Sequence, residues 1–277
     1  MPVRVVTDSN GDIPPEEAAR LNIVVVRSIL NIEGKSYVDG IDITRNEFYR
    51  RLPTLNPPPT TAAPSTADFE AAYRSCGSAD IVAIHLASTL SGIFAAARLG
   101  AEPLGEQVTV VDSEQASMGM GWQAVAAAEA AAAGASRDEV LRLVRSVQER
   151  VRLFASLDTI EYLRRGGRAS LLSARLGELL QIKPLIEVRA GAVSALARVR
   201  TRQKAREELA ARVEALGPLE RLAILHTDCL ADAQAMASRL APLSASAPWV
   251  VEATAVIGTH VGPGVIGAAA VMASKPA

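Results

Sequence analysis

The 277-residue sequence has few of the residues that build disulfide frameworks or metal sites. It contains two cysteines, Cys76 and Cys229, and three histidines, His85, His226 and His260, all far apart along the chain. This spacing excludes a disulfide framework and a CxxC metal site, and both thiols are expected to be buried and inert. The histidines match no ligand set, so no metal or other cofactor is expected.

The chain also lacks an excess of charge of either sign. Lysine and arginine number 29 against 30 aspartates and glutamates, which gives a net charge of -1. This balance argues against global attraction to nucleic acid or anionic lipid. Hydrophobic residues make up 49% of the sequence, which excludes a disordered chain because so much apolar surface can be buried.

Catalytic and membrane motifs are absent as well. The sequence has no HExxH, no phosphate loop ending in GKS or GKT, no GxSxG elbow and no EF-hand loop. Its first ten residues, MPVRVVTDSN, read as a strand rather than as a secretory signal. The uncharged run 253–274 contains His260 and a Gly-Pro-Gly sequence that would break a membrane helix. We therefore expect a cytoplasmic protein with at most transient membrane contact.

The first half of the chain alternates β-branched runs with helical patterns, as a parallel sheet with crossover helices requires. Strands are predicted at 3–7, 23–30, 80–86 and 107–112, and helices at 14–21, 44–52, 66–76, 91–99 and 116–133. Five prolines within 53–65 predict an extended loop there. Residues 1–150 are therefore expected to form an N-terminal three-layer α/β domain with a parallel sheet.

The second half follows a different pattern. Strands are predicted at 152–157, 182–188, 192–199, 221–227 and 249–257, and helices at 201–216 and 230–240, with a further helix broken by Gly166 and Gly167. Neighbouring strands joined by a turn at Gly191 imply antiparallel pairing. Residues 151–277 are therefore expected to form a C-terminal α+β domain with a mixed or antiparallel sheet.

Three hydroxyl-rich segments are candidates for one anion site. They are Thr60-Thr61 in the proline-rich loop, 88–92 (STLSG) at a strand-to-helix junction, and Thr259-His260. Each segment alone is more often a helix cap than a ligand site. The Gly-Pro-Gly sequence after His260 is expected to open a short helix whose N–H groups face the same anion. Hydroxyls, an imidazole and backbone amides together can hold a carboxylate without arginine.

The charges are unevenly distributed along the chain. Residues 160–206 contain eleven basic against three acidic residues, a local charge of +8. A solvated surface explains this stretch as well as a binding surface does. Nucleic acid is not an expected partner, because Tyr162 is the only aromatic residue in the stretch. An acidic protein partner is the better functional interpretation.

Eight ordered segments resemble the DegV family and together cover essentially the whole chain. They are TDS with Asp12, TTAAPS, LASTLSGI, VDS, IEYLRRGGR, IKP, RVRTRQKA and IGTHVGPG. The resemblance implies a parallel α/β domain, an α+β domain and one long-chain fatty acid buried between them. It also implies that the chain is not itself an enzyme. It would present the fatty acid carboxylate to a separate ATP-dependent kinase subunit, which forms an acyl phosphate for phospholipid synthesis.

Carried onto this sequence, the resemblance implies a set of binding residues. The carboxylate would be held by Thr61, Ser91, Gly92 and His260. Arg168, after the double glycine, would lie near the mouth of the pocket. Three of these residues, Thr61, Ser91 and His260, belong to the hydroxyl-rich segments described above.

The resemblance also bears on the kinase partner. Arg200 and Arg202 fall in the segment that resembles the kinase-docking surface. The family usually has serine and glutamine where this chain has Ala62 and Ala63, so the contacts of those side chains are lost. Two other hypotheses stay open: a lipid carrier or store without a kinase partner, and a serine hydrolase that uses Ser91.

Overall fold

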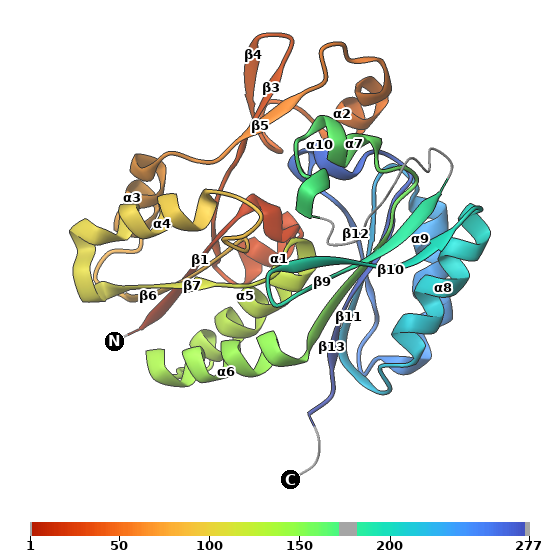
Figure 1. The fold of residues 1–277 in the computed structure, drawn as a ribbon. Helices are drawn as coiled ribbons and strands as arrows, with labels where there is room; N and C mark the ends of the chain where they lie inside the picture. Colours follow the sequence, from red (N-terminus) through yellow and green to blue (C-terminus); the bar gives the residue numbers. More distant parts are fainter. Residues whose placement is uncertain (1, 172–181, 275–277) are drawn as a thin grey trace.

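The computed structural model describes residues 2–171 and 182–274 and contains two main β-sheets with helices between and outside them (Figure 1). The N-terminal part has a parallel sheet in the order β2-β1-β6-β7. Its strands are β1 (Val3–Asp8), β2 (Val24–Val26), β6 (Asp80–His85) and β7 (Val108–Asp112). Helix α1 (Pro15–Arg20) joins β1 to β2.

Helices cover both faces of the parallel sheet. One face packs against α3 (Thr66–Arg74) and α4 (Ile93–Ala101), and the other against α5 (Ser117–Ala132) and α6 (Arg137–Arg150). This arrangement confirms the predicted three-layer α/β fold, in which each face of the sheet buries its apolar side chains under helices.

The predicted strand at 23–30 is wrong, because this segment belongs to two sheets. Strand β2 ends at Val26, and β3 (Ile29–Ile32) begins a small antiparallel sheet in the order β4-β3-β5. The other two strands are β4 (Lys35–Val38) and β5 (Thr60–Ala62), so the proline-rich segment supplies a strand within its loop. Helix α2 (Arg45–Arg51) packs its aromatic side chains against β3, which gives this sheet a core of its own.

The C-terminal part contains a six-stranded mixed sheet in the order β10-β9-β8-β13-β11-β12, which confirms the predicted sheet type. Its strands are β8 (Val151–Ser156), β9 (Lys183–Arg189), β10 (Ala192–Val199), β11 (Leu219–His226), β12 (Trp249–Glu252) and β13 (Ile266–Met272). Neighbours pair antiparallel, except for the parallel pair β11 and β12. Helices α8 (Arg202–Glu214) and α9 (Leu230–Leu240) cover the outer face.

The end of the chain corrects two predictions. Strand β12 ends at Glu252, and residues 255–257 of the predicted strand belong to helix α10 (Ala255–Val261). Gly262 and Gly264, with φ of 79° and 78°, then turn the chain into β13. The Gly-Pro-Gly sequence therefore ends a helix instead of opening one, because glycine adopts the left-handed conformation that stops a helix at low cost.

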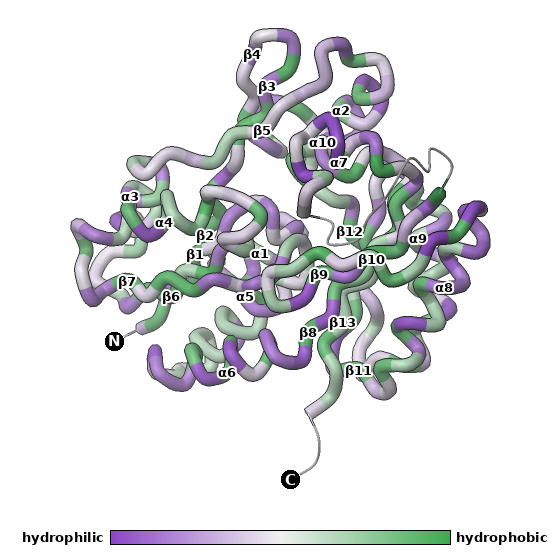
Figure 2. The backbone as a smooth tube through the Cα atoms, viewed as in Figure 1, coloured by the Kyte–Doolittle hydropathy of each residue, from purple (hydrophilic) through white to green (hydrophobic). Residues whose placement is uncertain are grey.

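Helix α5 lies between the two sheets and connects their cores. Residues 117–128 of this alanine-rich helix are buried, and the helix contacts β1 and β6 on one side and β8 and β13 on the other. Trp122 Nε1 donates a hydrogen bond of 3.0 Å to the carbonyl of Ala269 in β13, and its ring lies 4.6 Å from that of Trp249. The strands on both sides of α5 are largely hydrophobic in Figure 2, whereas α6 and α8 carry many polar residues. One apolar core therefore spans both parts of the chain.

The sequence predicts that both thiols are buried and inert. Cys76 is buried and Cys229 is partly buried, and both are free. Burial raises the pKa of Cys229 to about 11, so its thiol stays protonated at neutral pH. Separately, none of the helices within 2–171 and 182–274 has the length and apolar character that a bilayer crossing needs.

A buried carboxyl group lies beside the small sheet. The side chain of Asp39 is 1% exposed, and burial, with the nearby charge of Asp12, raises the pKa of Asp39 to about 6. Arg27 Nη1 donates to the main-chain carbonyl of Asp39 at 3.0 Å rather than to its carboxylate. The ionised form is therefore poorly compensated.

We expect Asp39→Asn to raise the free energy of unfolding at pH 8 and to change it little at pH 4. The pKa of Asp39 in the folded protein, about 6, lies above the ordinary value of 3.8. The stability that comes from the protonated carboxyl is therefore fully present below pH 3.8 and is lost as the pH rises through 6. The shift corresponds to at most about 3 kcal/mol. Urea unfolding at the two pH values measures this difference, and an equal effect at both would contradict the account.

Candidate functional site

A cavity of about 190 Å³ lies between the two main sheets, near the carboxyl ends of β1 and β6. One water molecule needs roughly 15 Å³ by the same measure, so the cavity can take a ligand of many atoms. Strands β1 and β6 are neighbours in the sheet, and the strands that follow them, β2 and β7, lie at opposite edges of it. The chain connections after β1 and β6 therefore run in opposite directions. Ligands of open α/β sheets bind in the crevice that such a divergence creates.

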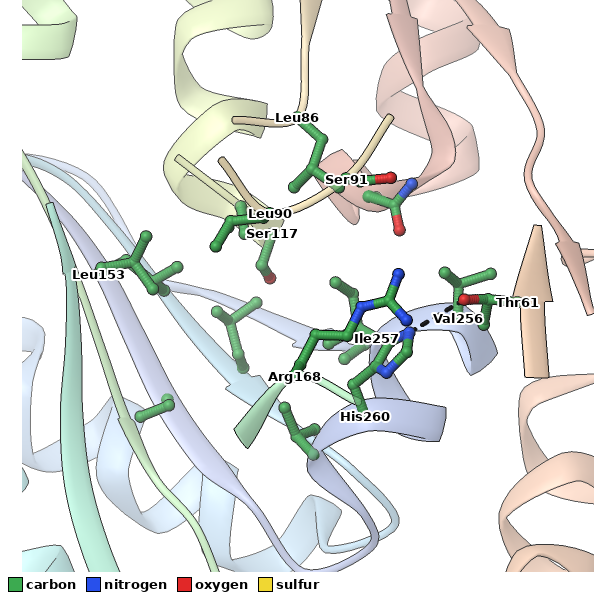
Figure 3. A pocket seen from close by; sticks show the side chains of 18 of the residues that line it. Thr61, Leu86, Leu90, Ser91, Ser117, Leu153, Arg168, Val256, Ile257 and His260 are labelled. Atoms are coloured by element: carbon green, nitrogen blue, oxygen red, sulfur yellow. Dashed lines mark hydrogen bonds between the residues drawn. The ribbon is translucent and has the colours of Figure 1, made fainter. Parts of the chain in front are cut away.

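Most of the cavity wall is apolar. The C-terminal sheet, helix α10 and the loop after β6 supply its aliphatic side chains, among them Leu86, Leu90, Leu153, Ile186, Val188, Val256 and Ile257. In Figure 3, Leu153 lies at one side of the view, and Thr61 and His260 lie toward the other. The site therefore combines a largely aliphatic wall with a polar cluster.

The polar cluster brings together side chains from four distant segments. Thr61 lies on β5, Ser91 precedes α4, Arg168 follows α7 (Glu161–Arg165), and His260 lies on α10. All four line the cavity, and Figure 3 shows Arg168 and His260 side by side. Thr61 Oγ1 is 3.0 Å from His260 Nε2, although the two residues are 199 positions apart. Each of the three hydroxyl-rich segments thus contributes a residue to the lining of one cavity, and Thr61 and His260 are in contact.

The imidazole of His260 is neutral in this setting. Burial lowers its pKa to about 4, and the charge of Arg168 acts in the same direction. Nδ1 is buried and has no hydrogen-bond partner within the described residues. A Cβ atom at Gly166 would lie 2.4 Å from Nδ1, so only glycine lets the end of α7 approach the ring. The first glycine of the RRGGR segment therefore has a packing role beside His260.

Arg168, which the resemblance places near the pocket mouth, lines the cavity. Its Nη1 donates to the carbonyl of Gly166 at 2.7 Å, and its guanidinium lies in the cavity wall (Figure 3). Among the described lining residues it is the only one with a permanent charge. An anion at this cluster would therefore find a positive charge without a competing carboxylate on the wall.

Ser91 and Gly92 differ in their relation to the cavity. Ser91 lines it, and its Oγ accepts a hydrogen bond of 3.4 Å from the N–H of Ile93 at the start of α4. Gly92 is the N-cap residue of α4, but it is exposed and is not part of the cavity lining. Ser91 is therefore the residue of this pair that lines the cavity.

Comparisons with known proteins show the family of the chain. The family model described as "Uncharacterised protein, DegV family" matches residues 2–273. The chain belongs to the DegV family. A DegV domain-containing protein of Deinococcus radiodurans is 34% identical over 275 residues, covering 97% of this chain and 98% of that protein.

Two solved DegV structures have the same fold. The first is described as "Fatty Acid Binding of a DegV family Protein from Thermus thermophilus". It has a TM-score of 0.89, is 32% identical and covers 99% of this chain and 100% of that one. The second, DegV of Bacillus subtilis, is described as a fatty acid binding protein. It has a TM-score of 0.86, is 28% identical and covers 99% of this chain and 100% of that one.

Several cavity residues of this DegV protein escaped the sequence analysis. Asn10, Ser28 and Ser117 line the cavity. Ala62 and Ala63, which the resemblance already singled out, line it as well. The polar residues that follow β1 are a local signal that could have indicated Asn10. The other positions depend on how distant segments pack.

The two arginines assigned to kinase docking lie outside the cavity and differ from each other. Arg200 is exposed. Arg202 forms a two-pronged ion pair with Asp158, at 2.8 and 2.9 Å, and Lys183 binds the same carboxylate at 2.5 Å. Arg202 therefore connects the start of α8 to the loop after β8, and only part of the basic stretch is free to meet a partner.

We expect Arg168→Met to raise the pKa of His260 while leaving it below 6.5. Removing the guanidinium removes one of the two causes of the low pKa, and burial, the larger cause, remains. The measurement is an NMR titration of the imidazole nitrogens in the parent and the variant. A parent pKa near 6.5, or no change in the variant, would contradict the described environment of His260.

Proposed function

We propose that this DegV protein binds one long-chain fatty acid, with the carboxylate at the polar cluster and the acyl chain along the aliphatic wall. The observation that carries the proposal is one permanent positive charge, Arg168, in a cavity whose described wall is largely aliphatic and carries no carboxylate. The fatty acid binding described for the Thermus thermophilus and Bacillus subtilis relatives supports the same ligand class.

The two ends of the ligand contribute differently to binding. Burying a tail of about 16 carbons at roughly 0.8 kcal/mol per methylene gives a gross gain near 12 kcal/mol. The tail therefore supplies affinity, and a few placed polar groups fix its orientation. Because His260 is neutral, the charge that meets the carboxylate comes from Arg168, with the hydroxyls of Thr61 and Ser91 as donors.

We further infer that the bound carboxylate is presented to a separate ATP-dependent kinase subunit for acyl phosphate formation. The sequence has no phosphate loop of its own, and the DegV resemblance implies such a partner. Arg200, exposed at the end of the C-terminal sheet, is the candidate contact for an acidic kinase surface. We propose that the protein performs this role in the cytoplasm.

The serine hydrolase hypothesis finds little support in the arrangement of Ser91. A nucleophilic serine needs a histidine within hydrogen-bond reach. Among the described residues, Ser91 Oγ has a hydrogen bond only from Ile93, and His260 Nε2 pairs with Thr61 instead. A lipid carrier without a kinase partner remains the second candidate, because its cavity would look the same.

Ser91→Ala and Thr61→Ala should each weaken palmitate binding by about ten- to a hundredfold, because a charged hydrogen bond contributes roughly 1.5–3 kcal/mol. Binding of 1-hexadecanol, which has the same tail and no carboxylate, should change much less. Displacement of a fluorescent fatty acid from delipidated protein measures both ligands. If both variants bind palmitate like the parent, the head group lies elsewhere.

Arg200→Glu should slow acyl phosphate formation in the presence of kinase and ATP while leaving palmitate affinity unchanged, because a rim charge acts mainly on encounter. Arg98→Glu, at an exposed position on α4, is the matched control. Arg202 is less suitable, since its removal also breaks the Asp158 pair. Turnover that is equal in all three proteins would argue against docking through Arg200, and no turnover in any would favour the carrier hypothesis.

A further inference from the structure

Asn10 and Ser28 form a polar pair on the cavity wall that the carboxylate site does not use. Both side chains are 1% exposed and both line the cavity. Asn10 Nδ2 donates a hydrogen bond of 3.0 Å to Ser28 Oγ, so the two groups are immediate neighbours. Their chemistry indicates what part of a ligand they can meet.

The orientation of the Asn10 amide is fixed by Asp8. The Asp8 Oδ1 atom accepts from the backbone N–H of Asn10 at 3.1 Å and from its Nδ2 at 2.8 Å. The other oxygen, Oδ2, lies 3.1 Å from both His85 Nδ1 and the N–H of Leu86. A carboxylate only accepts hydrogen bonds, so the amide nitrogen must face Asp8. Both hydrogens of Nδ2 are then used, and Oδ1 is the free acceptor of Asn10.

Ser28 completes the pair with a free donor. Its Oγ accepts from Asn10, and its backbone N–H donates to Ser9 Oγ at 3.2 Å. The hydroxyl hydrogen of Ser28 has no acceptor among the described residues. The wall therefore offers one acceptor, Asn10 Oδ1, beside one donor, Ser28 Oγ–H.

A carboxylate alone cannot satisfy this pair. It has no hydrogen to give to Asn10 Oδ1, and leaving a buried acceptor unpaired is unfavourable. A hydroxyl group both donates and accepts, so it matches both groups at once. Asn10 lies at the end of β1, and Ser91 follows the end of the neighbouring β6, so the pair is on the head-group side of the cavity.

We propose that the preferred ligands are fatty acids with a hydroxyl group at C2 or C3, which donates to Asn10 Oδ1 and accepts from Ser28 Oγ. This inference rests on the proposed fatty acid binding and narrows its substrate class. Asp8 acts as a positioning residue in this arrangement, because it holds the Asn10 amide.

The test is a competition assay on the full-length, delipidated protein with a fluorescent fatty acid as tracer. We expect 2- or 3-hydroxypalmitate to bind about tenfold more tightly than palmitate. The isomer 16-hydroxypalmitate, with its hydroxyl at the far end, should show no gain. Equal affinities for palmitate and both head-group isomers would overturn the inference. Failure of every fatty acid to bind would instead overturn the proposed function.

Two variants separate recognition from a structural role. Ser28→Ala keeps the contacts between Asn10 and Asp8, and it should abolish the preference while leaving palmitate affinity unchanged. Ser88→Ala, at an exposed position outside the cavity lining, should retain the preference. If Ser28→Ala weakens palmitate and the hydroxy acids equally, Ser28 belongs to the carboxylate site and the inference is wrong.

Discussion

The carboxylate of Asp12 holds the two parts of the chain together at the cavity. Its Oδ1 accepts the N–H of Thr254 at 2.7 Å, and its Oδ2 accepts the hydroxyl of Ser117 at 2.5 Å. Thr254 starts the helix that carries His260, and Ser117 starts the helix between the sheets. The distance between His260 and the N-terminal half of the site therefore depends on a contact made six residues before it. Asp12 is 1% exposed, and this burial raises the pKa of its carboxyl group.

The charge pattern of the cavity follows from burial. Burial lowers the pKa of both imidazoles on the wall, those of His226 and His260, and Arg168 supplies the only permanent charge among the described lining residues. An anionic ligand bound there would pair the charge of Arg168, and its apolar part would be removed from water. Ligand binding would then stabilise the folded state by mass action, with Arg168 as the main electrostatic partner.

Features that depend on residues close together in the chain could be predicted from the sequence. The strand pattern of Val3–Asp8 and the hydroxyl clusters at Thr61 and Ser91 are local signals, and strand ends converge in a parallel sheet. The prediction from sequence failed where contacts between distant residues determine the secondary structure. The apolar run at 249–257 fits a strand or a helix, and the bond between Thr254 and Asp12, 242 positions away, accompanies a helix.

Composition explains one further miss. Strand β13 is rich in alanine and has one glycine, so it lacks the β-branched signal of a strand, yet it lies in the middle of the sheet. The close approach of Gly166 to His260 joins residues far apart in the chain, so no local pattern predicts it. The ion pair of Arg202 with Asp158 likewise joins residues 44 positions apart.

The most direct test of a fatty acid-binding cavity is native mass spectrometry of the purified protein. We expect a species carrying about one fatty acid per chain, whose added mass disappears on denaturation and whose lipid extract contains the free acid. Apo protein as the only species, even after incubation with palmitate or oleate, would contradict fatty acid binding by this protein.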